Sequence, residues 1–378
     1  MKQRPATESS LDADMQQMLV DSARRWCERE CTPAARAQVS DHVDGCPPER
    51  WIGLAQLGWL GLTLPQDVNG LGAGLREQCL LLEQLGRGLL VEPFVASAAL
   101  GATLFDRMAQ SELRDDWLTA LASGQRRVVW AAWEPDGDTR LRQADAVAAE
   151  HGGVWMLSGA KGLMPGVGGA SGWLVTAQLR GDPEQMGLFL LQAGADGVGV
   201  ASARMYDGRH AGKLSFEGAA GMLLRRGPNR EMLALLNGVL DQGRVAHCAE
   251  TLGTAQAAFD ITLNYVRART QFGRALGANQ VIQHRLVDLY VQIQEAWALC
   301  LQAASDASSR NVAALCLCTG QVARLTWEES LQLHGAIGMT EEYALGEYVR
   351  RLALAADLYG NGPAHAEDLA SLYLEISP

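Results

Sequence analysis

Residues 265–284 hold side chains whose types and spacing suit a ligand that carries phosphate groups and aromatic rings. The guanidinium of Arg269 is planar and always charged, so it can neutralise a pyrophosphate through paired hydrogen bonds. Phe272 follows three residues later, and on a continuous helix it would share a face with Arg269 and lie against a ring system. Gln271 and Gln280 add amides, which both donate and accept hydrogen bonds. Taken singly, these residues also fit a surface charge and a core aromatic side chain.

Residues 332–343 form a second segment of this kind further along the chain. The amide of Gln332 can pair with an adenine edge or a ring oxygen. Gly335 and Gly338 lack a Cβ atom, which lets a backbone approach a phosphate or a ring closely, although glycines also form ordinary turns. Leu333 and Ala336 complete the segment. Taken singly, each residue of the two segments fits an ordinary structural role.

Three blocks of sequence would position these segments. Residues 1–123 place apolar side chains at helical spacing, which predicts an N-terminal helical domain. Residues 124–228 change to short apolar runs separated by turn residues, which predicts a middle β-barrel or sandwich. Residues 229–378 return to helical spacing. On the helix expected at 285–303 an apolar face that includes Trp297 predicts a bundle whose surface also forms a dimer interface.

Composition excludes several classes of protein. The chain has 378 residues, 48% of them hydrophobic, so it is neither disordered nor too small for a sizeable core. Its formal net charge of -11 argues against a nucleic-acid partner, because phosphate binding is built on cationic surfaces. No apolar stretch approaches the roughly 20 residues of a membrane span. The polar first residues lack a hydrophobic signal core, so we expect no secretion signal.

The eight cysteines show no metal-binding spacing. None forms a Cys-x-x-Cys pair, and Cys316 and Cys318 are too close in sequence for a usual zinc pair. We therefore expect no metal site and free, mostly buried thiols. This pattern is typical of a reducing compartment, which predicts a cytoplasmic protein.

The two ligand segments, YVRARTQFGR at 265–274 and QLHGAIGMT at 332–340, resemble motifs of the acyl-CoA dehydrogenase family. LGL at 60–62 and the Glu134-Pro135 pair are similar to further landmarks of that family, so the resemblance covers nearly the whole chain. It implies an α+β architecture with an N-terminal helical domain, a middle β-domain and a C-terminal four-helix bundle. It also implies FAD, an acyl-CoA thioester substrate and an electron-transfer acceptor protein.

In this family FAD lies across a dimer interface, so the resemblance divides the site between two subunits. One role is contact with the adenosine pyrophosphate of the neighbouring subunit's FAD. It would fall to Arg269, Gln271, Phe272, Gln280, Gln332, Leu333, Gly335 and Ala336. Arg244 would lie near the substrate. The implied reaction is α,β-dehydrogenation, in which a carboxylate removes the α-proton while the β-hydride passes to the flavin.

The chain departs from the family at the catalytic base. The resemblance places a glutamate either in the C-terminal segment or just before the arginine at the start of a helix; here these positions are Gly360 and Gly243. Glycine can neither take nor give a proton. Asp241 and Glu250 are nearby in sequence and are candidates for a displaced base. A helix-start charge and a structural carboxylate are the simpler interpretations of the two residues.

The implied flavin bed departs as well. A Trp-Ile-Thr stretch of the family corresponds to Leu163-Met164-Pro165, and an expected threonine corresponds to Trp133. Proline has no backbone donor, and none of these side chains carries a hydroxyl.

Some members of the family work as heteromers of an active and a degenerate chain, and some of these act on dicarboxylic, branched or steroid side-chain CoA esters. The leading hypothesis is a degenerate, small or β-type subunit of such a heteromer, with a heterotetramer as the expected assembly. The alternatives are a homo-oligomeric enzyme with a displaced base and a non-catalytic protein that binds flavin or a CoA ester.

Overall fold

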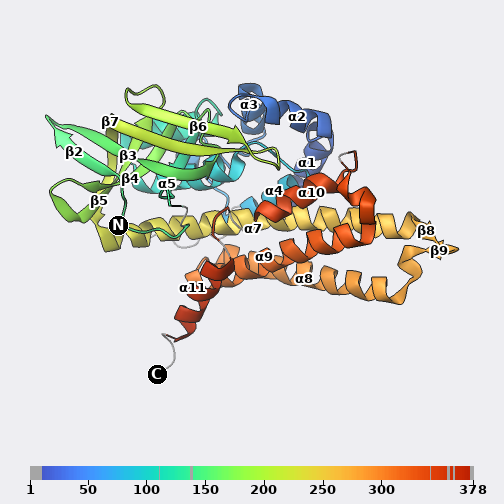
Figure 1. Ribbon diagram of the computed structural model, residues 1–378. Coiled ribbons are helices and arrows are strands. Elements are labelled where there is room, and N and C mark those ends of the chain that lie inside the picture. The colour runs from blue at the N-terminus through green and yellow to red at the C-terminus, as the bar shows by residue number, and fades with distance from the viewer. Residues whose placement is uncertain are drawn as a thin grey trace. The chain divides into compact units, whose positions relative to one another are not determined.

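The computed structural model describes residues 11–109, 111–136, 139–340, 342–355, 358–360 and 362–374. The chain forms two compact units, each built from segments that are not adjacent in the sequence. Of the described residues, unit 1 takes those within 33–78 and 91–243, and unit 2 takes those within 11–32, 79–90 and from 244 onward. The predicted order of a helical region, a β-region and a second helical region is confirmed (Figure 1).

Unit 1 begins with short helices. They are α2 (Pro33–Asp41), α3 (Pro48–Gln56), the π-helical turn η2 (Val95–Gly101), α5 (Ala102–Met108) and α6 (Ser111–Ala122). Both α2 and α3 start at a proline, which suits the first turn because its missing N–H would have no partner there. α4 (Leu75–Arg87) starts in unit 1 and ends in unit 2.

The β-region of unit 1 is one mixed sheet. Its strands are β1 (Val128–Ala131), β2 (Val147–His151), β3 (Val154–Pro165), β4 (Gly172–Leu179), β5 (Asp182–Gln192), β6 (Val198–Arg204) and β7 (His210–Pro228). The order is β1-β4-β2-β3-β7-β5, and β6 pairs with β7. Because β4 also pairs with β5, the ladder from β4 through β2, β3, β7 and β5 closes on itself. This closure leaves few unpaired strand edges and accords with the barrel alternative of the sequence prediction.

Unit 2 is helical. It contains α1 (Ala13–Glu30), most of α7 (Asn229–Ala268), α8 (Gln280–Ser305), α9 (Ser309–His334), α10 (Leu345–Ala355) and α11 (Gly362–Leu374). α9 packs against α8, α10 and α11, and Figure 1 shows α8 and α9 running side by side. On α8, Leu286, Leu289, Ile293 and Cys300 are buried, whereas Trp297 of the predicted apolar face is half-buried. The short hairpin of β8 (Thr270–Gln271) and β9 (Arg274–Ala275) lies between α7 and α8.

Two glycines fix the crossing of α4 and α7 within unit 2. A Cβ atom at Gly86 would lie 1.9 Å from the carbonyl oxygen of Glu250, and one at Gly253 would lie 1.9 Å from that of Glu83. The two backbones therefore touch where no side chain separates them. The hydroxyl of Thr254 donates to the Gly86 carbonyl at 3.1 Å and secures the same crossing. This contact anchors the middle of α7, and the candidate site residues follow toward its end.

Candidate functional site

The first predicted segment lies at the exposed end of α7. The N–H of Arg269 donates to the Tyr265 carbonyl at 2.8 Å, which completes the last turn of the helix, and Arg269 and Gln271 are exposed. Phe272 has a φ of 51° and stands fully exposed in the turn between β8 and β9. The expectation that Phe272 shares a helical face with Arg269 is therefore wrong, because α7 has already ended at Ala268. Gln280 is exposed on the first turn of α8.

The second predicted segment lies at the end of α9. Gln332, Gly335 and Ala336 are exposed, whereas Leu333 is buried, so its side chain is not available to a ligand. Gly335 ends the helix with φ 63° and ψ -143°, a conformation that residues with a Cβ avoid. The following turn, η4 (Gly335–Met339), carries Ala336 on the surface.

Tertiary structure brings the two segments together at one end of unit 2. The ring of Tyr265 stacks on that of His334 with centroids 4.2 Å apart, and its hydroxyl donates to the His334 carbonyl at 3.4 Å. The last turn of α7 is therefore fixed against the last residue of α9. We call the exposed residues around this contact the bundle-end surface: Arg269, Gln271, Phe272, Gln280, Gln332, Gly335 and Ala336.

At both predicted base positions, a neighbouring side chain occupies the place that a Cβ atom would take. In unit 1, a Cβ atom at Gly243 would lie 2.4 Å from Cδ1 of Leu100. In unit 2, Gly360 has a φ of 135°, and a Cβ atom there would lie 2.3 Å from Nε2 of His365. The imidazole of His365, which is buried, therefore fills the space that a side chain at position 360 would enter. Sequence reasoning missed His365, although it lies only five residues after Gly360.

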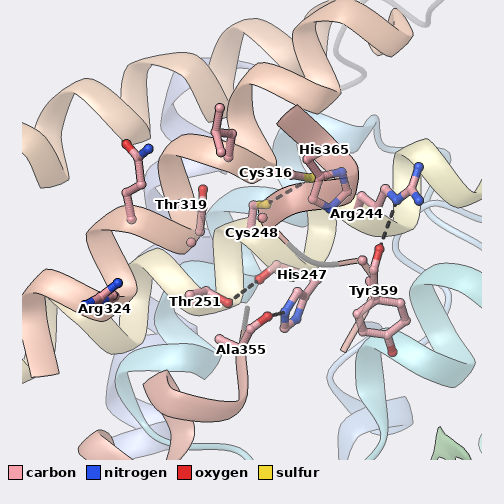
Figure 2. A pocket seen from close by; sticks show the side chains of 15 residues that line it. Arg244, His247, Cys248, Thr251, Cys316, Thr319, Arg324, Ala355, Tyr359 and His365 are labelled. Atoms are coloured by element: carbon pink, nitrogen blue, oxygen red, sulfur yellow. Dashed lines mark hydrogen bonds between the residues drawn. The ribbon is translucent and has the colours of Figure 1, made fainter. Parts of the chain in front are cut away.

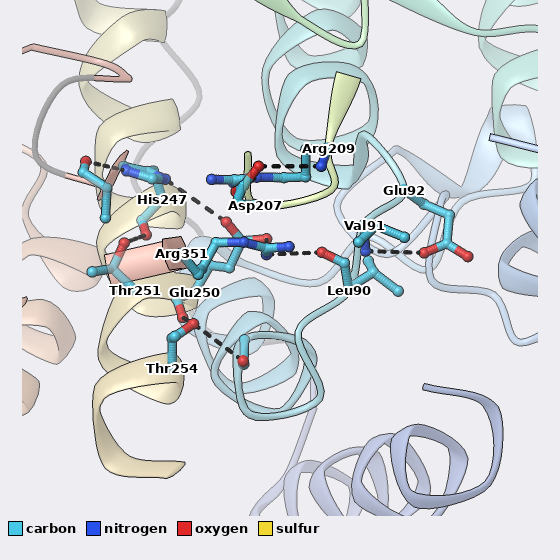
Figure 3. Close-up of polar contacts among 12 residues, drawn as sticks. Leu90, Val91, Glu92, Asp207, Arg209, His247, Glu250, Thr251, Thr254 and Arg351 are labelled. Atoms are coloured by element: carbon cyan, nitrogen blue, oxygen red, sulfur yellow. Dashed lines mark hydrogen bonds and ion pairs between the residues drawn. The ribbon is translucent and has the colours of Figure 1, made fainter. Parts of the chain in front are cut away.

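Glu250, one candidate for a displaced base, belongs to a buried polar network in unit 2 (Figure 3). Its carboxylate lies 4.0 Å from a guanidinium nitrogen of Arg351 and 3.8 Å from Nδ1 of His247. Arg351 donates in turn to the Leu90 carbonyl at 2.8 Å. These contacts connect α7, α10 and the end of the α4 segment, which suits a structural carboxylate. Asp241, the other candidate, is also buried on α7, in unit 1.

A cavity of about 190 Å³ adjoins Gly360 inside unit 2. Figure 2 shows Arg244, His247, Tyr359 and His365 among its lining residues. Nε of Arg244 donates to the Tyr359 carbonyl at 3.0 Å, and Nε2 of His247 lies 2.8 Å from the Ala355 carbonyl. Arg244, predicted to lie near the substrate, is thus buried and tied to the segment that precedes Gly360.

Thiols also line this cavity. The Sγ atoms of Cys248 and Cys316 lie 3.8 Å apart, and the hydrogen bond between them, together with burial, raises the pKa of Cys316 well above its ordinary value. Cys316 is therefore not an activated nucleophile, because nucleophilic cysteines have lowered pKa values. Across the part of the chain that the structure describes, every cysteine is free and no three His, Cys, Asp or Glu side chains converge as a metal site would require.

The segment predicted to form a flavin bed lies on β3 in unit 1. Leu163 is exposed, Met164 and Trp133 are buried, and a Cβ atom at Gly162 would lie 2.4 Å from the Glu134 carbonyl. The N–H of Gly162 donates to the Trp133 carbonyl at 2.7 Å, which holds β3 against the Trp133–Glu134 segment. We refer to Trp133, Glu134 and residues 161–165 as the β3 segment.

A buried ion pair supports the β3 segment. The ammonium of Lys161 is fully buried and donates to Glu134 Oε1 and, at 3.2 Å, to the Thr176 hydroxyl. Burial lowers the pKa of Lys161, while the neighbouring Glu134 opposes that shift. Glu134 Oε2 meets no hydrogen-bond donor among the described residues. From the sequence, Glu134 is only a landmark of the family resemblance, because the partner of a buried lysine cannot be inferred from spacing.

Comparison with known proteins gives matches along most of the chain. Residues 13–125 match the family model "Acyl-CoA dehydrogenase, N-terminal domain", and residues 233–371 match "Acyl-CoA dehydrogenase, C-terminal domain". The acryloyl-CoA reductase (NADH) of Anaerotignum propionicum is 26% identical over 369 residues, which cover 93% of this chain and 92% of the relative.

Among the described residues, none of the helices combines the length and the apolar composition that a membrane span requires.

Solved structures with the same fold include two-chain complexes. A chain of a variant of the Tcur3481-Tcur3483 steroid ACAD is 28% identical, with a TM-score of 0.85 and coverage of 96% of this chain and 98% of that one. A chain of the ChsE4-ChsE5 complex from Mycobacterium tuberculosis has a TM-score of 0.85 at 23% identity, with coverage of 97% and 99%. The two family models together match more than half of the chain, and both give the same assignment. The chain belongs to the acyl-CoA dehydrogenase family.

Proposed function

We propose that this chain is the subunit without a catalytic base in a heteromeric, FAD-dependent acyl-CoA dehydrogenase. The complex would introduce an α,β double bond into an acyl-CoA thioester. The observation that carries the proposal is the pair of glycines at the two base positions, since His365 fills the space beside Gly360 and Leu100 fills that beside Gly243. The sister chain would supply the carboxylate that removes the α-proton.

The bundle-end surface fits a role toward FAD of a neighbouring subunit. Arg269 presents an exposed guanidinium that can pair with pyrophosphate oxygens, and Phe272 presents a whole ring face to a partner. Gln332 adds an exposed amide, while Gly335 has no atom within 4 Å of the place of a Cβ and leaves its backbone open to close approach. When bound, FAD supplies the hydride acceptor of the reaction, and an electron-transfer protein would reoxidise the complex.

The β3 segment fits a flavin of this chain's own poorly. Pro165 offers no N–H, and neither Leu163, Met164 nor Trp133 carries a hydroxyl. Lys161 is fully buried and engaged with Glu134 and Thr176, so its ammonium is not available to a ring at the surface. The sister chain would therefore supply the flavin bed as well as the base, and the complex would hold fewer flavins than subunits.

The similar structures support a two-chain assembly. The 28% identical chain comes from a structure described as a steroid ACAD named for two components, Tcur3481 and Tcur3483. As part of the proposal, this chain has a comparable partner chain. The substrate of the complex is a CoA ester with a bulky or branched acyl group. Glu250 does not favour the alternative of a displaced base, because its carboxylate already faces Arg351 and His247.

The test compares the chain alone with the co-expressed pair. The purified chain is reconstituted with FAD and assayed with a panel of straight, branched and steroid side-chain acyl-CoA esters and an artificial electron acceptor. We expect negligible turnover alone, and turnover with fewer flavins than subunits when a sister chain from the same genome is co-expressed. Robust turnover by the chain alone that Glu250→Gln or Asp241→Asn abolishes would establish a displaced base instead. A colourless chain and an inactive complex would favour a non-catalytic binding protein.

A further inference from the structure

Three rings meet beneath the bundle-end surface and belong to none of the roles described so far. Tyr265 lies on the last turn of α7, His334 is the last residue of α9, and Tyr343 precedes α10. The His334 and Tyr343 rings have centroids 5.2 Å apart, and the Tyr265 and Tyr343 rings meet edge to face at 6.3 Å. With the Tyr265–His334 stack at 4.2 Å, the three rings form one cluster, which we call the ring cluster.

The hydrogen bonds of His334 fix the orientation of its ring. Nδ1 lies 2.8 Å from the Ser330 carbonyl, which can only accept, so Nδ1 carries a proton. Burial lowers the pKa of His334, and burial likewise raises the pKa of Tyr343. In the neutral ring Nε2 is an acceptor, and the Tyr343 hydroxyl donates to it at 3.2 Å. The His334 ring is thus held from both sides by two directed hydrogen bonds.

The same cluster fixes the backbone on both sides of the bundle-end surface. The carbonyl of Tyr265 accepts from the Arg269 N–H at 2.8 Å, and the Arg269 carbonyl accepts from the Leu276 N–H at 2.9 Å. On the other side, His334 sits between Leu333 and Gly335 in the chain. A Cβ atom at Gly338 would lie 3.0 Å from Cβ of His334, so the η4 turn closes directly on this residue. The backbone of Arg269 thus lies one helical turn from Tyr265 of the ring cluster, and Gln332 lies two residues before His334.

We propose that the ring cluster is a positioning device that holds Arg269 and Gln332 in a single arrangement for the FAD of a neighbouring subunit. This inference rests on the proposed function. Neither Arg269 nor Gln332 is buried, so packing of their own side chains does not fix where they point. A ligand that needs both groups at once binds more tightly when their backbones are already in place, because less freedom is lost on binding.

The test uses the co-expressed complex and measures the dissociation constant of FAD by titration of the apo-complex, with its melting temperature recorded alongside. Tyr343→Phe keeps the ring and removes only the bond to His334; we expect FAD binding to weaken about threefold to tenfold, the usual worth of one hydrogen bond. The matched control is Tyr348→Phe on α10, which removes a tyrosine bond to the Arg87 carbonyl of 2.9 Å. That variant should bind FAD as the wild type does.

A double-mutant cycle with Arg269→Ala separates this inference from the proposed function. If Tyr343 acts through Arg269, the effects of Arg269→Ala and Tyr343→Phe are less than additive. Unchanged FAD binding in Arg269→Ala would contradict the proposed role of the surface. Weakened binding in Arg269→Ala with unchanged binding in Tyr343→Phe would overturn the positioning role alone. Equal weakening in Tyr343→Phe and Tyr348→Phe would show general loosening of unit 2 and overturn the positioning role too.

Tyr265→Phe, which keeps the stack and removes only the 3.4 Å bond, is the second variant, with a smaller expected effect.

Discussion

The bundle-end surface in unit 2 and the β3 segment in unit 1 contrast in what they keep of the family pattern. The bundle-end surface keeps the arginine, the glutamines and Gly335 of its motifs, and all of them are exposed. The β3 segment keeps its buried support, the Lys161–Glu134 ion pair and the close contact at Gly162, but its outward groups carry no hydroxyl. Removing one partner of such a buried ion pair is strongly destabilising, because it leaves the other charge uncompensated.

Under the proposed function, this contrast explains how one chain can contribute to a site that it does not complete. Residues offered to another subunit must stay exposed and ordered, and they depend on unit 2 alone. The residues that would contact a flavin of this chain lie in the β3 segment of unit 1. The two sets can therefore change independently. The predictions that follow test whether only the β3 segment and the base positions have lost their function.

The largest change in rate is at stake when a base is restored. A correctly placed general base contributes roughly 10²–10⁴-fold in rate. If the β3 segment is also unfit for flavin, Gly360→Glu in the isolated chain will recover none of this, even with His365→Ala to make room. The measurement is turnover of an acyl-CoA panel by the FAD-reconstituted double variant. A rate increase of roughly 10²–10⁴-fold in the double variant would mean that the missing base was the sole defect. It would contradict the interpretation that the β3 segment cannot hold a flavin.

The next effect concerns the support of the β3 segment. Lys161→Met should destabilise unit 1 by about 3–5 kcal/mol, because it leaves the Glu134 carboxylate buried without its cation. Urea denaturation followed by tryptophan fluorescence gives the free energy of unfolding. Lys161→Met with Glu134→Leu should recover most of the loss, since removing both charges leaves nothing uncompensated. A cost below about 1 kcal/mol for the single variant, the level typical of exposed pairs, would show that the pair is not a support.

A smaller effect is expected at the bundle-end surface. Arg269→Ala should weaken FAD retention by the co-expressed complex by about 1.5–3 kcal/mol, the value of a hydrogen bond to a charged group. The melting temperature should not change, because the side chain is exposed. Flavin content after extensive dialysis is the measurement, and Arg29→Ala, an exposed arginine of α1 that pairs with Glu30, is the control. Full retention of flavin would remove Arg269 from the site.

The smallest effect is a pH dependence at His334. Its folded-state pKa lies below the ordinary value of 6.5, so below that pH the unfolded chain takes up a proton that the folded chain resists. The free energy of unfolding should therefore fall as the pH drops through 6.5. Denaturation at about pH 7.5 and about pH 5.5 measures the slope, and His334→Gln should have a shallower one. An identical slope in the variant would assign the pH dependence to other groups.

Much of the fold could be predicted because its signals are local. Helical spacing on α8 and short apolar runs between Val128 and Pro228 depend only on residues near one another in sequence. The motifs at 265–274 and 332–340 are local as well, and the ligand site that they predict stays a prediction. Phe272 shows the limit of such reasoning, since Gly273 follows it and the chain turns where a continuous helix was assumed.

The sequence by itself determined the order of the regions, and it determined that glycines stand at both predicted base positions and that the β3 segment lacks hydroxyls where the resemblance implies them. These are matters of residue type at a position. Only the tertiary structure decided that Tyr265 stacks on His334, that His365 fills the space beside Gly360 and that Lys161 pairs with Glu134. Each of these contacts joins different secondary-structure elements or crosses a turn. Spacing along one helix or strand carries no information about them, since they form only when packing brings the backbones together.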